Sequence, residues 1–226
     1  MNFPLRSRVA AEFLGTAFLL AAVVGSGIMG ERLAAGNVAI ALLANTLSTG
    51  AALAVMILVL APISDAHFNP AVTLAMSATG NLPWRDVPAY LLAQFSGAFA
   101  GVAAANLMFG LPLFFVSTHA RHGAGQVWSE VVATFGLVFV IWGCSRFRPS
   151  ATAWAVGAYI ASAYWFTAST SFANPAVTLA RSASNTFAGI RPGDVPGFVV
   201  AQLFGAAAAV ACFRWLVPAG IPQKVG

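Results

Sequence analysis

The chain has 226 residues, of which 59% are hydrophobic and only 8% are charged, and its mean hydropathy is +0.83. Soluble domains carry about 25% charged residues, so this chain has too few charges to cover a surface that faces water. The formal net charge of +5 is no evidence for nucleic-acid binding, because the basic residues are scattered among apolar segments. We therefore expect an integral protein of a lipid bilayer.

Six apolar segments are long enough to cross a bilayer, which takes about 20 residues. The first contains Glu12 and is longer than the apolar part of a cleavable signal peptide, so we interpret it as a membrane span. Two further apolar segments, residues 69–77 and 174–182, are too short to cross alone, and each opens with Asn-Pro. The predicted spans are residues 9–28, 38–60, 88–110, 127–145, 151–168 and 196–217.

The basic residues between these spans orient the chain, because short cytoplasmic loops are enriched in Lys and Arg. More of them fall on the inner side when both termini are cytoplasmic. The predicted location is the inner (plasma) membrane, with several spans and both ends inside. The outer side then holds Arg32, Arg121, Arg181 and Arg191.

The two halves of the chain repeat each other, over approximately residues 9–110 and 127–217. "NPAVTLA" occurs twice, "AEFLGT" corresponds to "SEVVAT", and "DVPAYLLAQFSG" corresponds to "DVPGFVVAQLFG", all in the same order. Each half holds three spans and one half-span. Because three is odd, the second copy enters from the opposite face, which predicts a single channel-like domain, residues 1–226, built as an inverted repeat.

The twin Asn-Pro-Ala motifs each predict the start of a short helix. Asn is a strong N-cap, and Pro suits the first helical position because its missing N–H would have no partner there. Two half-helices that meet N-terminus to N-terminus place about half a positive charge each at the midplane. This arrangement repels cations but lets amide and carbonyl groups bind a neutral solute. The motif residues are Asn69, Pro70, Ala71, Asn174, Pro175 and Ala176.

Four polar residues recur at matched places inside predicted spans. A charged side chain there costs about 2.5–3.5 kcal/mol on insertion scales, so Glu12 and Glu130 need partners. We expect both to accept hydrogen bonds from backbone N–H groups of the loops that precede the half-helices, with a proton relay as the alternative. Gln94 and Gln202 are predicted to support the same loops.

In this order along the chain, "AEFLGT", "HFNPAVT", "AQFSGA", Glu130, the second NPA and "AQLFGA" resemble the major intrinsic protein family, the aquaporins and aquaglyceroporins. The resemblance covers essentially the whole chain. It implies an all-α membrane protein with six transmembrane helices and two re-entrant half-helices. It also implies a homotetramer with one pore per protomer, which conducts water or small uncharged solutes passively, without catalysis, cofactor or metal.

The family has a selectivity filter on the outer side of the twin motif. By the family's spacing, the second-span filter residue is Thr49, a small polar side chain where many members have an aromatic one. The fifth-span residue is Ser162 by the same counting. If Gly157 aligns with the family's glycine in that span, the residue is Tyr164 instead, and both assignments stay open.

In most members an Arg directly follows the second NPA, but here that residue is Val177, and the Asp that follows in glycerol-conducting members is Thr178. Val in place of Arg removes a positive charge and up to five N–H donors, so we expect a wider, less polar filter. Arg181, one turn further along, either replaces the missing charge or only complements the end of the half-helix. We interpret His67 as a hydrogen-bonded loop residue rather than a gate.

A filter with Thr49 and Val177 resembles that of bacterial aquaglyceroporins associated with arsenic resistance. The resemblance implies flux of neutral arsenite, As(OH)3, and of methylated arsenicals, besides water and glycerol-like polyols. The alternatives are a general glycerol/urea channel or a water channel. Less favoured is a proton-coupled secondary transporter, which also uses inverted repeats and broken helices.

Overall fold

The computed structural model describes residues 3–217, and within this range the chain is all-α. Three-residue 3-10 turns precede three of the helices, at Trp84–Asp86, Pro149–Ala151 and Pro192–Asp194. The helices are α1 (Leu5–Leu33), α2 (Val38–Ser64), α3 (Pro70–Ala78), α4 (Val87–Met108), α5 (Ala124–Phe147), α6 (Thr152–Phe166), α7 (Pro175–Arg181) and α8 (Val195–Leu216).

Five of these helices, α1, α2, α4, α5 and α8, are long and apolar enough to cross a membrane. Helix α6, predicted as the span 151–168, has 15 residues and is shorter than expected. It ends because the backbone turns extended at Thr167. The chain then runs without helix to Asn174, the N-cap of α7. The predicted half-helices are present as α3 and α7.

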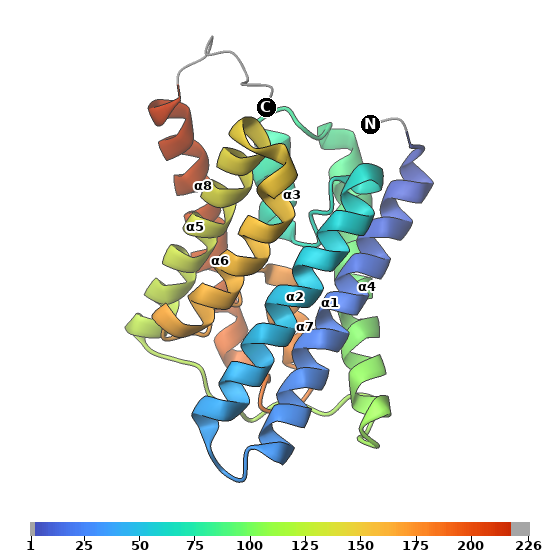
Figure 1. Cartoon of the computed structure of the whole chain (residues 1–226), viewed down its shortest axis with the longest axis vertical. Helices are drawn as coiled ribbons and strands as arrows, with labels where there is room; N and C mark the ends of the chain where they lie inside the picture. The colour runs from blue at the N-terminus through green and yellow to red at the C-terminus, as the bar shows by residue number, and fades with distance from the viewer. Residues whose placement is uncertain (1–2, 218–226) are drawn as a thin grey trace.

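The two halves of the chain use the same helix contacts. Helix α1 packs against α2 and α4, helix α5 packs against α6 and α8, and α2 packs against α6. In Figure 1, α1 begins and α8 ends at the same end of the molecule. Helix α3 lies in the half nearest that end, and α7 lies in the opposite half. The short helices therefore enter from opposite sides.

Glycines allow the two halves to approach closely where α2 crosses α6. A Cβ atom on Gly157 would lie 2.6 Å from the Gly50 carbonyl oxygen, and one on Gly50 would lie 2.9 Å from the Gly157 carbonyl oxygen. The contact is reciprocal, as expected for residues beside an axis that relates the halves. Small residues at such crossings are typical of membrane helices.

The outer surface of the helices is apolar. Phe18, Leu92 and Trp215 are among many large apolar side chains that are exposed. Conversely, Glu12, Gln94, Glu130 and Gln202 have no exposed surface. This inside-out distribution of polar groups suits a protein whose surroundings are hydrocarbon.

Candidate functional site: a pore between two re-entrant loops

The segments that precede α3 and α7 have the same unusual backbone. Neither contains a glycine, yet each has three residues with positive φ, at corresponding places in the repeat: Asp65, Ala66 and Phe68, and Thr170, Ser171 and Ala173. A left-handed conformation costs an L-residue on the order of 1–2 kcal/mol. It also turns the carbonyl groups away from any helical partner, so surrounding side chains must hold these loops.

Glu12 holds the first loop. Its carboxylate accepts from the backbone N–H groups of His67 at 2.9 Å and Phe68 at 2.7 Å. The Ser64 hydroxyl donates to the same carboxylate at 2.7 Å. Glu130 holds the second loop in the same way, accepting from Phe172 N–H at 2.9 Å and Ala173 N–H at 2.8 Å. The hydrogen bonds expected from the sequence are therefore present in both halves.

The two glutamines connect these carboxylates to the half-helices. The Gln94 amide donates to Glu12 and to the Thr73 hydroxyl, both at 2.8 Å. Gln202 donates to Glu130 at 2.6 Å and to the Thr178 hydroxyl at 2.8 Å. Sequence reasoning overlooked the two threonines as partners, although both stand at the same place in the repeated "NPAVT".

The two asparagines cap the half-helices and join them. Asn69 accepts from Ala71 N–H at 2.9 Å, and Asn174 accepts from Ala176 N–H at 3.0 Å. The side-chain amide of Asn69 donates to the Ala173 carbonyl at 2.7 Å, and that of Asn174 donates to the Phe68 carbonyl at 2.8 Å. Each amide has a second N–H that has no protein partner among the described residues.

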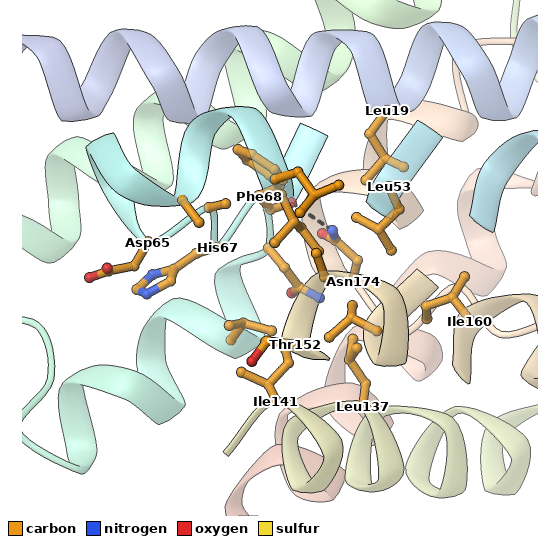
Figure 2. Close-up of a pocket in the computed structure, with 18 of the residues that line it drawn as sticks. Leu19, Leu53, Asp65, His67, Phe68, Leu137, Ile141, Thr152, Ile160 and Asn174 are labelled. Carbon is orange, nitrogen blue, oxygen red and sulfur yellow. Dashed lines mark hydrogen bonds between the residues drawn. The ribbon is translucent and has the colours of Figure 1, made fainter. Parts of the chain in front are cut away.

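Asn69 and Asn174 both line a cavity of about 700 Å³. Figure 2 shows Asp65 and His67 toward one end of the lining and Leu53 and Ile160 toward the other, with Asn174 between them. Apolar side chains predominate in the lining, with uncharged polar ones between them. The charged residues that line the cavity in the described part of the chain are Asp65 and Arg181.

Thr49, Tyr164 and Val177 line the same cavity, and all three side chains are buried from the outer surface. The Tyr164 hydroxyl lies 3.4 Å from the Thr49 hydroxyl oxygen. The assignment of Ser162 to the lining was wrong, because Ser162 is an exposed residue of α6 that does not line the cavity. A shift of two residues moves a side chain about 200° around a helix, so only one of the two candidates can face inward.

Arg181 also lines the cavity and is 2% exposed. Its Nε–H donates to the Ala188 carbonyl, and its guanidinium carbon lies 3.4 Å from the centre of the Phe172 ring. A second guanidinium, from Arg121 in the loop between α4 and α5, lies 4.9 Å from the same ring centre. No sequence pattern indicates this approach, because Arg121 lies in a loop without periodicity.

His67 lines the cavity near its other end. Its Nδ1 lies 3.1 Å from the Thr73 hydroxyl oxygen, and its ring packs against Tyr90 with centres 5.5 Å apart. It is thus a hydrogen-bonded residue of the loop. Within residues 3–217, no three His, Cys, Asp or Glu side chains gather as a metal site, and the buried carboxylates are occupied by N–H and O–H donors.

The sequence of the chain is similar to those of known membrane channel proteins. Residues 2–149 match the family described as major intrinsic protein. The chain is 56% identical over 221 residues to Aquaglyceroporin AqpS of Rhizobium meliloti (strain 1021), covering 98% of this chain and 94% of that one. It is 36% identical over 154 residues to Aquaporin NIP1-1 of Zea mays, covering 63% of this chain and 50% of that one.

The fold also matches a solved structure. The X-ray structure of the aquaglyceroporin from Plasmodium falciparum superposes with a TM-score of 0.72, at 22% sequence identity, over 98% of this chain and 97% of that chain. At this identity the match establishes the helix arrangement.

Proposed function

The chain belongs to the major intrinsic protein family, and from this premise we propose that it forms a passive transmembrane channel for small uncharged solutes. The observation that carries the proposal is the cavity that passes Asn69 and Asn174, where two half-helix starts meet and each amide keeps one N–H for a solute. This pore acts by selection and not by chemistry, which suits a family of channels rather than enzymes.

The lining explains which solutes are favoured. An ion that enters this largely apolar cavity loses hydration that the uncharged polar groups of its wall do not fully replace. A neutral polyol can exchange its water for the Asn amides and for loop carbonyls that left-handed backbone keeps out of helical bonds. Its carbon face can meanwhile rest on the aliphatic wall.

We assign the selectivity filter to Thr49, Tyr164 and Val177. Valine offers no hydrogen bond to single-file water, whereas an arginine there would offer several donors. The filter therefore favours solutes that are larger and less strongly hydrated than water. Glycerol, urea and As(OH)3 all meet this description, and a methylated arsenical would gain further from the Val177 methyl groups.

Neutral arsenite and methylated arsenicals are the finer assignment of substrate, beside glycerol-like polyols. As(OH)3 presents three hydroxyl groups at about the size of glycerol, which suits a lining that combines polar groups with apolar wall. The likeness to Aquaglyceroporin AqpS supports a solute channel wider than a strict water channel.

Stopped-flow permeabilities of proteoliposomes for water, glycerol, urea and arsenite test the proposal. We expect arsenite and glycerol flux well above that of protein-free vesicles, and a ratio of water to glycerol flux that is low. Water flux alone would support the water channel instead. Uptake that depends on an imposed proton gradient would support the coupled transporter.

The assembly and location remain part of the proposal. We place the protein in the inner membrane with both termini in the cytoplasm and as a homotetramer with one pore per protomer. The inverted repeat, residues 9–110 and 127–217 within a single channel domain, is supported by the matched carboxylate and amide networks. Cross-linking in native membranes and protease protection of terminal tags test these assignments.

A further inference from the structure

Arg121 and Arg181 form a pair of buried positive charges near the end of the cavity that holds Tyr164 and Phe172. Arg121 is 8% exposed and Arg181 is 2% exposed. Within residues 3–217, no ion pair or hydrogen bond joins either guanidinium group to a carboxylate. The carboxylate of Glu130 attracts both guanidinium groups, but it accepts its hydrogen bonds from other groups. Buried charges without a contacting carboxylate are expensive, so two of them in one place require an explanation.

Arg121 reaches this place from outside the helix bundle. Its backbone N–H donates to Asp194 at 2.8 Å, which fixes the loop. Its guanidinium donates to the carbonyl groups of Gly189 at 2.8 Å and Ser169 at 3.3 Å. Carbonyl groups satisfy the N–H donors but leave the formal charge in place. Burial lowers the pKa of Arg121 to about 10, so the group is protonated at neutral pH.

Arg181 brings its charge to the cavity itself. The bond from Nε to Ala188 fixes the guanidinium, and its terminal nitrogens have no protein partner among the described residues. Both guanidinium groups lie against the ring of Phe172, which is itself part of the cavity wall. The aromatic ring partly stabilises them. Arg181 lines the cavity directly, and Arg121 lies against a ring that lines it.

We propose that Arg121 and Arg181 together supply the fixed positive charge of the outer pore mouth and exclude cations, protons included, in a channel whose residue 177 is valine. This inference rests on the proposed channel function. Two like charges in a poorly solvated wall raise the energy of any cation that passes. A neutral solute feels no such repulsion and can accept a hydrogen bond from the terminal N–H groups of Arg181.

Proton leak and solute flux measured on the same proteoliposomes test the inference. A potassium gradient with valinomycin drives protons, and a trapped pH dye reports them. The ratio of proton to glycerol flux corrects for the amount of open channel. We expect this ratio to be low for the wild type and to rise at least about tenfold in the double variant Arg121→Gln/Arg181→Gln, because two repulsive charges are removed.

Two further variants separate charge from structure. Arg32→Gln is the matched control, because Arg32 also donates to a carbonyl, that of Phe109, and stacks on its ring, but is exposed outside the cavity. It should leave the ratio unchanged. Arg121→Lys keeps the positive charge but loses the planar guanidinium group. We expect its ratio of proton to glycerol flux to stay low, whereas that of Arg121→Gln should rise.

The outcomes distinguish the two levels of the proposal. A wild type without glycerol flux contradicts the channel function. A wild type that conducts glycerol and protons alike, or a double variant as tight as the wild type, contradicts the role of the arginines alone. Equal leak in Arg121→Lys and Arg121→Gln shows a structural role and also overturns the inference. If the double variant cannot be reconstituted, Arg181→Gln decides by itself, because it removes the charge that lines the cavity.

Discussion

Asn69 and Asn174 each hold the loop that leads into the other's helix: the amide of Asn69 donates to the Ala173 carbonyl, and the amide of Asn174 donates to the Phe68 carbonyl. The two half-helices are therefore joined by a reciprocal pair of bonds and not merely placed end to end. The same two side chains cap the helices and line the cavity, so a change at either one alters the loops and the cavity wall together.

The variant Asn174→Ala should reduce both the thermal stability of the protein and its glycerol flux. It removes the N-cap of α7, worth about 0.5–2 kcal/mol, and the bond to Phe68. We expect a Tm lower by several degrees and glycerol flux reduced several-fold at equal protein density in the vesicles. Asn69→Ala should behave similarly because its bonds are equivalent. Undiminished flux in both variants would contradict a role for the amides in permeation.

The variant Val177→Arg should narrow the filter. Its guanidinium adds bulk and donors beside Thr49 and Tyr164, so arsenite and glycerol flux should fall while water flux is retained or rises relative to them. Stopped-flow measurements of all three solutes on one vesicle preparation check this. Val177→Leu is the control for bulk without charge. Solute flux unaltered by Arg would mean that residue 177 does not set selectivity.

Tyr164 and Ser162 offer a matched pair on one helix. Tyr164→Ala removes a ring from the cavity wall, so permeability to solutes larger than glycerol should increase. Ser162→Ala changes an exposed residue, and we expect every permeability to stay at the wild-type value. A set of polyols of increasing length measures the difference. If the serine variant changed the size limit and the tyrosine variant did not, the filter assignment would be reversed.

Glu130→Gln should destabilise the second re-entrant loop. The amide keeps the shape, but one oxygen becomes an NH2 group. This group faces either the N–H donor of Phe172, which bonds to Oε1, or the donors of Ala173 and Gln202, which bond to Oε2. Hydrogen bonds to a charged group contribute about 1.5–3 kcal/mol each, so a loss of roughly 3 kcal/mol is expected. Thermal unfolding in detergent measures it. Glu12→Gln in the other half is the comparison, and a Tm unchanged in both would show that the carboxylates are dispensable.

Gly157→Ala should weaken the crossing of α2 and α6, because its methyl group would lie 2.6 Å from the Gly50 carbonyl oxygen. Overpacking of this kind costs about 1–3 kcal/mol. A lower Tm is the expected result, and Gly193→Ala, where a Cβ atom meets nothing within 4 Å, is the control. A stability equal to that of the control would show that the helices can separate at no cost.

Much of this architecture could be predicted from the sequence motifs that occur in both halves of the chain. The twin "NPAVTLA", the matched glutamates and the matched glutamines all concern groups whose chemistry is local: a cap, a proline and a buried carboxylate that needs donors. Because both halves of the chain carry these motifs, the sequence also predicts that the two half-helices meet. The hydrogen bonds of these residues agree with that prediction, and their part in permeation stays a prediction.

Other features depend on where helices stop and on how loops fold back. Tyr164 and Ser162 differ by less than a turn, so only the actual rotation of α6 decides between them. Arg121 reaches Phe172 through three-dimensional closure of the loop after α4, for which no periodicity exists. The shortness of α6 likewise arises from the extended chain that must reach Asn174.

The six residues with positive φ around the half-helices have a consequence for how the channel can move. Each loop is held in this conformation by a buried carboxylate on one side and by the Asn amide of the opposite half on the other. A partial opening would break several of these bonds at once. We therefore expect the two loops to move less than the rest of the lining, which hydrogen exchange of their backbone N–H groups would measure.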